Sequence, residues 1–239
     1  TIYRDGFIHE ISFKNGGHVD KPLTKLGPTR KTGTTVEFFP DPEIFDSVKF
    51  NFSIIEERMQ ESAFLINGLT IEINDENEDK HVNFHYDNGL VSFVEYINEN
   101  KTALHKVIDM FGEKNGIDVK IAMCYTDSYS ENIVSFVNNV KTIDGGTHEV
   151  GFKTAVTKVF NEYIKNNNLL KGKNTTLEGS DTREGLTAVI SVSVPESLLQ
   201  FEGQTKGKLG TPLAKTVVES IVYEKLTYFL QENKSVASL

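Results

Sequence analysis

The sequence predicts an α+β fold, and three observations support that prediction. Short segments such as residues 119–125 and 186–194 are rich in apolar side chains in the manner of strands. Two longer segments, residues 148–166 and 211–229, carry apolar side chains at helical spacing. Along this half of the chain two strands, a helix, another strand and a helix follow one another, which is the order expected for helices packed on a sheet.

The elements predicted for the first 86 residues are short. Residues 1–13 alternate polar and apolar side chains around Asp5 and Gly6, which is typical of a hairpin turn. Pro40 and Pro42 end the strand before them, because proline cannot donate a hydrogen bond to a neighbouring strand. In order, we predict a hairpin over 1–13, a basic, turn-rich loop over 22–31, a strand over 34–39, a helix over 54–67 and paired strands over 69–73 and 82–86.

A change in composition at residues 87–89 is interpreted as a domain boundary, which gives domains 1–86 and 87–239. Thr147 and Thr211 are predicted N-caps of the two long helices, with Pro212 in the first turn of the second. In order, we predict a helix over 90–98, strands over 119–125 and 133–140, a helix over 148–166, a polar loop over 166–174, a strand over 186–194 and a helix from 211 with the buried stripe Leu213, Val217, Val218, Ile221, Val222, Leu226 and Phe229.

The composition is that of an ordinary folded domain and restricts the possible partners. The formal net charge of −9 opposes DNA binding, which depends on neutralising phosphates. Residues 141–215 carry ten basic and eight acidic side chains, a net charge of +2, which leaves −11 for the remainder. The single cysteine, Cys124, excludes an internal disulfide and fits a reducing cytoplasm. No apolar run approaches the roughly 18 residues of a membrane span, so we expect no membrane partner.

Two stretches could be functional sites but have simpler explanations. His81 and His85 are of a metal-binding residue type, but apolar residues alternate with them as in a strand, where four residues separate the two rings by roughly 13 Å. That is too far for one ion, and we predict no metal site. Residues 145–148, Gly-Gly-Thr-His, could be an anion nest or a catalytic histidine site, and we favour a flexible turn that leads into a capped helix.

The connection between residue 194 and the last helix is the strongest candidate site. Residues 201–210 contain Gln204, Lys206, Lys208 and three glycines. Glycine lets the backbone approach an anion, lysine supplies a compact positive charge and glutamine a neutral donor, which together suit a terminal phosphate. A solvated surface loop would contain the same residue types, and no Walker sequence is present. Composition alone leaves both interpretations open.

Four stretches carry a resemblance to a known family. Phe-Glu-Gly-Gln-Thr-Lys-Gly-Lys-Leu-Gly at 201–210 resembles the Gln-Thr-Lys loop in the ATPase region of bacterial type IIA topoisomerase B subunits. Three further stretches agree in order: Lys-Thr-Gly-Thr-Thr-Val-Glu-Phe at 31–38, Asp-Gly-Gly-Thr-His-Glu-Val-Gly-Phe at 144–152 and Glu-Gly-Ser-Asp-Thr-Arg-Glu-Gly-Leu-Thr-Ala-Val at 178–189. Residues 14–17 and 194–201 look more like the B subunit of topoisomerase IV than like that of its close paralogue, DNA gyrase.

The resemblance implies a fold and a set of site residues. The chain would be the C-terminal remainder of a GHKL-type ATPase domain, residues 1–86, followed by a transducer domain with a ribosomal-protein-S5-like fold, residues 87–239. Lys206, as the catalytic cation, and Gln204 would reach the γ-phosphate of ATP. Thr34 would join the water network around the adenine, although strand propensity also explains a threonine there. Val36 would line the pocket wall, and Arg4 would lie at the pocket mouth, where competitive inhibitors bind.

The resemblance also implies the activity of the whole enzyme. Such an enzyme passes one DNA duplex through another in the cytoplasm, uses ATP and Mg²⁺, dimerises through its B subunit on ATP binding, and assembles with a topoisomerase A subunit. The family's catalytic glutamate, magnesium-binding asparagine and glycine-rich lid are expected before Thr1. We therefore interpret the chain as a fragment that is inactive alone and binds no cofactor tightly. Ile143 stands where the family often has a basic residue, which weakens any DNA contact there.

Two alternatives remain at this point. One is a fragment of the B subunit of DNA gyrase, which would introduce supercoils rather than separate linked duplexes. The other is a stand-alone S5-like module that binds nucleic acid without ATP. Residues 31–38 argue against the module, because an isolated module has no need of the end of an ATPase domain.

Overall fold

The computed structural model of the chain describes residues 1–169 and 176–237. Contacts within the chain divide it into two units, a first unit of residues 1–55 and a second unit of residues 56–239, and each is described by itself. The domain boundary predicted at residue 87 stays a prediction. No helix in the described part of the chain combines the length and apolar character needed to cross a membrane.

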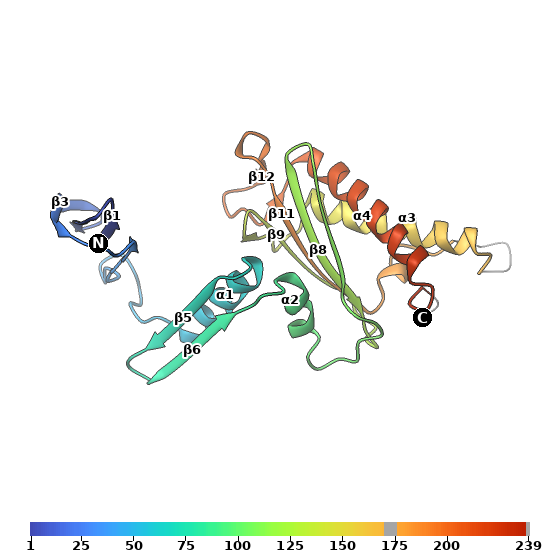
Figure 1. The fold of residues 1–239 in the computed structure, drawn as a ribbon, viewed down its shortest axis with the longest axis horizontal. Helices are drawn as coiled ribbons and strands as arrows, with labels where there is room; N and C mark the ends of the chain where they lie inside the picture. The colour runs from blue at the N-terminus through green and yellow to red at the C-terminus, as the bar shows by residue number, and fades with distance from the viewer. Residues whose placement is uncertain (170–175, 238–239) are drawn as a thin grey trace. The chain divides into compact units, whose positions relative to one another are not determined.

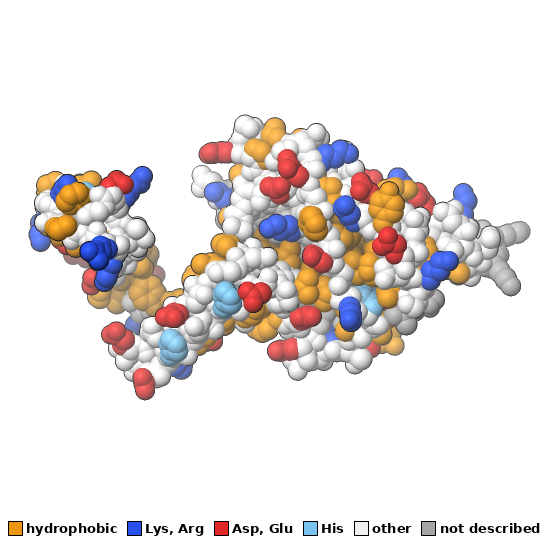
Figure 2. Space-filling view, viewed as in Figure 1, with side chains coloured by type: hydrophobic (Ala, Val, Ile, Leu, Met, Phe, Trp, Pro, Cys, Tyr) orange, Lys and Arg blue, Asp and Glu red, His pale blue; other side chains and the backbone are white. Residues whose placement is uncertain are grey.

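The first unit is an antiparallel sheet with the strand order β3-β2-β1-β4 (Figure 1). Its strands are β1 Ile2–Arg4, β2 Phe7–Lys14, β3 His18–Pro28 and β4 Gly33–Thr34. All 55 residues of the unit are described, and none of them is buried. Hydrophobic side chains therefore lie on its surface, as Figure 2 shows.

Two of the three predictions for the first unit need correction. The hairpin over 1–13 is confirmed, since β1 and β2 pair across a turn at Asp5 and Gly6. The loop predicted over 22–31 is wrong, because most of it lies in β3. β3 is an edge strand with an irregular register. Proline is tolerated there because an edge strand has a neighbour on one side only, so the missing N–H of Pro22 need not break a backbone hydrogen bond. The strand predicted over 34–39 is wrong beyond Thr34, and β4 pairs with β1 over two residues.

The second unit is built on a five-stranded sheet with the order β10-β9-β11-β8-β7. Its strands are β7 Ile108–Lys114, β8 Ile117–Tyr125, β9 Asn132–Val137, β10 Val140–Lys141 and β11 Leu186–Ser193. β11 pairs antiparallel with β8 and parallel with β9, so the last of these strands along the chain lies at the centre. β7 was not predicted because its sequence does not alternate apolar and polar residues. Phe111 is apolar but lies on the exposed face, 71% exposed, and Gly112 follows it.

Helices cover both faces of this sheet. The helices are α1 Phe52–Leu65, α2 Leu90–Ile97, α3 Thr147–Asn166 and α4 Pro212–Glu232. α3 and α4 pack side by side in the same core as Ile121 and Met123 of β8 (Figure 1). Ala122 and Cys124, the alternate residues of β8, belong to a second core with Phe93 of α2. The predicted helices are confirmed to within two residues at the ends that were predicted.

The remaining elements of the second unit form small sheets. β5 Thr70–Asp75 and β6 Lys80–His85 pair antiparallel, which confirms the predicted pair of strands and places His81 and His85 on a strand. The polar loop predicted over 166–174 falls partly on residues 170–175, which lie outside the described residues; α3 ends at Asn166 as expected.

Neither predicted threonine caps its helix through a side-chain hydrogen bond. Gly146 is the N-cap of α3, and the hydroxyl of Thr147 donates to the carbonyl oxygen of Thr211 at 2.7 Å. Thr211 does occupy the N-cap of α4, but its hydroxyl donates to the carbonyl oxygen of Leu198 at 2.9 Å. The two threonines therefore tie the beginnings of α3 and α4 to each other and to the segment before α4.

The buried stripe of α4 is largely as predicted. Val217, Val218, Ile221, Val222 and Leu226 are buried. Leu213 and Phe229 are only half-buried, and their neighbours Ala214 and Leu230 occupy the core instead.

Replacing Phe152 of α3 by alanine should lower the free energy of unfolding by about 3–5 kcal/mol, because its ring is fully buried and leaves a cavity. The matched change Phe111→Ala removes an exposed ring and should cost less than about 0.5 kcal/mol. Urea denaturation followed by circular dichroism measures both, and equal losses would contradict the assigned core.

Candidate functional site

Gln204 and Lys206 lie at the tip of a small β-hairpin between β11 and α4. Its strands are β12 Phe201–Glu202 and β13 Lys208–Leu209, which pair antiparallel. The connection predicted from the sequence is thus itself a folded element. Lys208 Nζ lies 2.9 Å from the Glu202 carboxylate on the opposite strand, so one lysine of the hairpin is neutralised.

Lys206 is exposed and differs from Lys208 in its partners. Its backbone has a φ of 54°, in the left-handed region, which is uncommon outside glycine, asparagine and aspartate. Among the described residues it has no ion-pair partner, and its ammonium lies 5.9 Å from the centre of the Phe201 ring. Gln204 is exposed at the same tip. The tip therefore presents a cation and a neutral amide to solvent.

The base of the hairpin rests on the turn before α3. The amide of Asp144 donates to the carbonyl oxygen of Gly207 at 2.9 Å, and the amide of Leu209 donates to the carbonyl oxygen of Gly145 at 3.0 Å. A Cβ on Gly146 would lie 2.4 Å from the Leu209 oxygen, so only glycine permits this approach. A turn before α3 is confirmed, but its backbone is bonded to β13 rather than flexible.

His148, at the start of α3, is fully buried and cannot touch a substrate. Its Nε2 lies 3.1 Å from the Thr142 hydroxyl, which donates to the carbonyl oxygen of Ser135 at 3.0 Å. The Ser135 hydroxyl donates to the Glu149 carboxylate at 2.7 Å. Burial lowers the pKa of His148 to about 4, so the ring is neutral near pH 7. The polar chain beneath the hairpin is structural, and sequence reasoning did not find it.

The other predicted site residues lie in the first unit. Thr34 is in β4 opposite Ile2 of β1, and Arg4 ends the same strand β1, with its guanidinium 3.6 Å from the carboxylate of Asp5. Val36 follows β4 and is 79% exposed. The sheet thus places Thr34 and Arg4 on adjacent strands.

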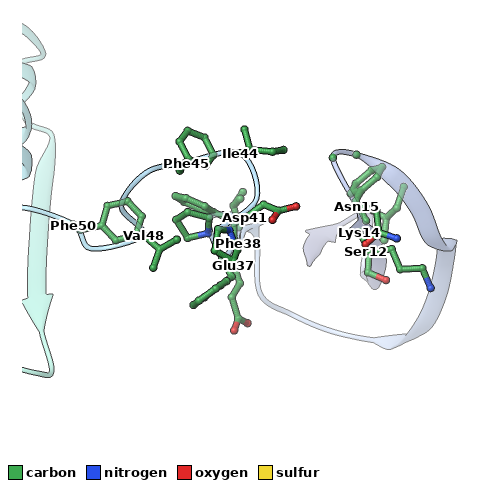
Figure 3. A pocket seen from close by; sticks show the side chains of 18 of the residues that line it. Ser12, Lys14, Asn15, Glu37, Phe38, Asp41, Ile44, Phe45, Val48 and Phe50 are labelled. Carbon is green, nitrogen blue, oxygen red and sulfur yellow. The ribbon is translucent and has the colours of Figure 1, made fainter.

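A hollow of about 1370 Å³ in the first unit was not predicted. It lies between the end of the β2–β3 hairpin, with Lys14 and Asn15, and the segment that carries Phe38, Phe45 and Phe50 (Figure 3). Val36 is among its lining residues, whereas Thr34 and Arg4 are not. The Phe38 and Phe50 rings meet edge to face at 5.7 Å. The aromatic side chains that line it are 56–80% exposed. The closely spaced phenylalanines between residues 38 and 50 are the feature of the sequence that could have indicated the hollow.

The described residues offer no group of three metal-ligating side chains from the His, Cys, Asp and Glu set. His85 instead contacts the Thr70 hydroxyl at 3.0 Å and the Asp87 carboxylate at 3.2 Å. Cys124 is a packed thiol, with its sulfur 3.1 Å from the carbonyl oxygen of His105, and burial raises its pKa. We assign neither a metal ligand nor a nucleophile to these positions.

Comparison with known proteins relates this geometry to a family. The family model described as DNA gyrase B matches residues 89–239, more than half of the chain. The chain belongs to the DNA gyrase B family. The resemblance drawn from the sequence is therefore confirmed.

Curated relatives of this gyrase B family chain include two topoisomerase B subunits. The B subunit of DNA topoisomerase 4 from Bacillus subtilis (strain 168) is 54% identical over 239 residues, which are 100% of this chain and 36% of that protein. The B subunit of DNA topoisomerase 4 from Staphylococcus aureus (strain Mu50 / ATCC 700699) is 55% identical over 234 residues, 97% of this chain and 35% of that protein. The chain thus spans little more than a third of their length.

Solved structures of the family have the same fold. The 43K ATPase domain of Thermus thermophilus gyrase B, in complex with an aminocoumarin, has a TM-score of 0.84 and 38% identity, over 99% of this chain and 64% of that chain. The topoisomerase IV ATP-binding domain of Francisella tularensis, in complex with a small-molecule inhibitor, has a TM-score of 0.83 and 28% identity, with the same coverage of 99% and 64%. The predicted α+β class is confirmed.

The buried His148 predicts a pH-dependent stability. Since its pKa falls from 6.5 to about 4 on folding, the unfolded chain binds a proton that the folded chain does not between those values. The free energy of unfolding should therefore fall by about 3 kcal/mol from this group as pH drops from 7 to below 4.

His148→Gln should remove this contribution, so its stability difference from wild type should shrink as the pH falls. Urea denaturation at several pH values measures this. The exposed His81→Gln is the control and should run parallel to wild type. Parallel curves for His148→Gln would contradict the assignment.

Proposed function

We propose that the chain is part of the B subunit of an ATP-dependent type II DNA topoisomerase, where it couples ATP binding and hydrolysis to gate closure and DNA strand passage. The observation that carries this proposal is the exposed Lys206, unpaired among the described residues, on a hairpin whose base is seated on the turn before α3. It is supported by 54% identity over the full chain to the B subunit of a DNA topoisomerase 4.

Lys206 would place its ammonium on the γ-phosphate of ATP, and Gln204 would donate its amide to the same group. A fixed positive charge at this position stabilises the charge that develops during phosphoryl transfer. Because the contact exists only while that phosphate is present, the hairpin would also report the nucleotide state to α3 and α4. Lys206 fits this role since no described carboxylate competes for its ammonium.

The adenine would be held by residues of the first unit. Thr34 would join the water network around the base, Val36 would line the pocket wall, and Arg4 would lie at the pocket mouth. Support comes from the adjacent strands that carry Thr34 and Arg4 and from the similarity to ATPase domains solved with inhibitors. Mg²⁺ belongs to the proposed reaction, but we assign it no ligand among the described residues.

The proposed partners are DNA, a topoisomerase A subunit and a second B subunit that joins on ATP binding, all in the cytoplasm. Basic and acidic side chains are interspersed over the face of the second unit in Figure 2. Ile143, 75% exposed, is apolar. The proposal therefore assigns no DNA contact to a particular residue.

The second candidate is that the chain is part of the B subunit of DNA gyrase, because the matching family model is described as DNA gyrase B. The complete subunit, assembled with its A subunit, distinguishes the two by its products. Decatenation and relaxation are expected for topoisomerase IV, whereas ATP-dependent supercoiling would identify gyrase. A stand-alone nucleic-acid-binding module is disfavoured by the match of residues 1–239 to one protein.

Lys206→Ala in the complete subunit should lower the kcat of ATP hydrolysis about 100-fold, because a charge that stabilises the transition state is lost. Nucleotide binding, measured by titration with a non-hydrolysable analogue, should be weakened but retained. Lys208→Ala is the matched control, since that lysine is already paired with Glu202, and should change kcat less than about threefold. Wild-type hydrolysis by the Lys206 variant would refute the assignment.

A further inference from the structure

An ion pair joins α1 to the sheet of the second unit. Lys141 Nζ of β10 lies 2.5 Å from one carboxylate oxygen of Glu61, and Arg58 of α1 lies 3.3 Å from the other. The Glu61 side chain is only 10% exposed, and that of Lys141 35%. A charge this buried needs its partners, because removing Lys141 leaves a poorly solvated carboxylate with Arg58 as its remaining cation.

Aromatic packing fixes the same helix beside the pair. Phe64, one turn beyond Glu61, is buried and stacks on Phe93 of α2 with ring centres 4.6 Å apart. Phe93 in turn lies 6.1 Å from Phe136 of β9, and Phe136 is the strand partner of Lys141. α1 is therefore attached to the β9–β10 ladder by both a charge and an apolar contact.

Lys141 also begins the segment that carries the candidate site. Thr142 follows it, and its hydroxyl is hydrogen-bonded to Ser135 of β9 and to His148 of α3, which fixes the segment against these two elements. Residues 144–146 then hold the base of the Lys206 hairpin through two backbone hydrogen bonds and the close approach of Gly146 to Leu209. The distance along the chain from Lys141 to this seat is only three residues.

We propose that the Glu61–Lys141 ion pair positions the Lys206 hairpin, by tying α1 to residues 141–146 on which the hairpin rests. This inference rests on the proposed function of Lys206. α1 lies before the predicted boundary at residue 87 and Lys141 after it. A displacement of α1 would therefore be transmitted to the hairpin through a charge contact and a short, hydrogen-bonded segment. Glu61 and Lys141 are positioning residues and do not touch the nucleotide.

The test combines hydrogen–deuterium exchange with ATP turnover in the complete subunit, for Lys141→Met, Glu61→Gln and the double variant. Each single variant should speed exchange of the Asp144 and Leu209 amides about tenfold, because these two amides form the backbone hydrogen bonds between the hairpin and its seat. The double variant should show no further increase, since both changes break one contact. kcat should fall about tenfold with KM for ATP changed less than about twofold, as expected when a catalytic group is displaced by a remote change.

Lys225→Met is the matched control, because this exposed lysine of α4 forms its ion pair with Glu224 of the same helix, at 3.6 Å. It should leave both measurements unchanged, and Lys141→Arg should restore them towards wild type. Unchanged exchange of the Asp144 and Leu209 amides in a folded Lys141→Met protein would overturn the proposal. If that variant does not fold, Glu61→Gln, which keeps the side-chain volume, decides the matter by the same measurements.

The two readouts separate this proposal from the function of Lys206. Faster exchange in Lys141→Met together with wild-type turnover in Lys206→Ala would support the positioning role and would refute the role of Lys206 in hydrolysis. Unchanged exchange in Lys141→Met together with low turnover in Lys206→Ala would refute the positioning role and would support the role of Lys206.

Discussion

The docking of β13 on the turn at residues 144–146 is the contact on which the candidate site depends. It consists of two backbone hydrogen bonds and a glycine that allows the Leu209 backbone to come within a distance no side chain would permit. Because α3 begins directly after this turn and α4 shortly after β13, the contact joins the N-terminal ends of both helices. Thr147 strengthens the junction by bonding to the Thr211 carbonyl instead of capping its own helix. The tip with Gln204 and Lys206 is thus exposed while its base is fixed.

Elements whose burial follows a simple period could be predicted from the sequence. α3 and α4 bury side chains at helical spacing, β8 and β11 are short apolar runs that are mostly buried, and the positions of all four were confirmed. β7 could not be predicted, because an exposed phenylalanine and a glycine interrupt its alternation. β3 was missed for a different reason: its prolines are typical of loops, and only its position at the sheet edge makes them acceptable. In both cases the environment in the sheet outweighed the local composition.

The candidate site could be predicted from the sequence only in part. Gln204 and Lys206 could be singled out because a cation, an amide and glycines lie within a few residues of one another. The parts that hold them could not be, since Glu61 and Lys141 are 80 residues apart in sequence and meet only in the folded chain. The threonine caps failed because a hydroxyl can bond to a distant carbonyl as well as to its own helix. Long-range contacts, rather than residue types, distinguish the support of the site from ordinary surface.

Lys206 and Lys208 show why composition alone could not choose between a phosphate site and a solvated loop. The two residues are of one type, are separated by a single glycine and are both exposed. The antiparallel register sets Lys208 opposite Glu202, and an anionic ligand would have to compete with that carboxylate for the Lys208 ammonium. Lys206 falls beyond the last pair, at a backbone conformation that turns the chain, where no strand partner can neutralise it. The register of a hairpin with two-residue strands thus determines which lysine is available to an anion, while the contact of β13 with the turn before α3 fixes the base of that hairpin.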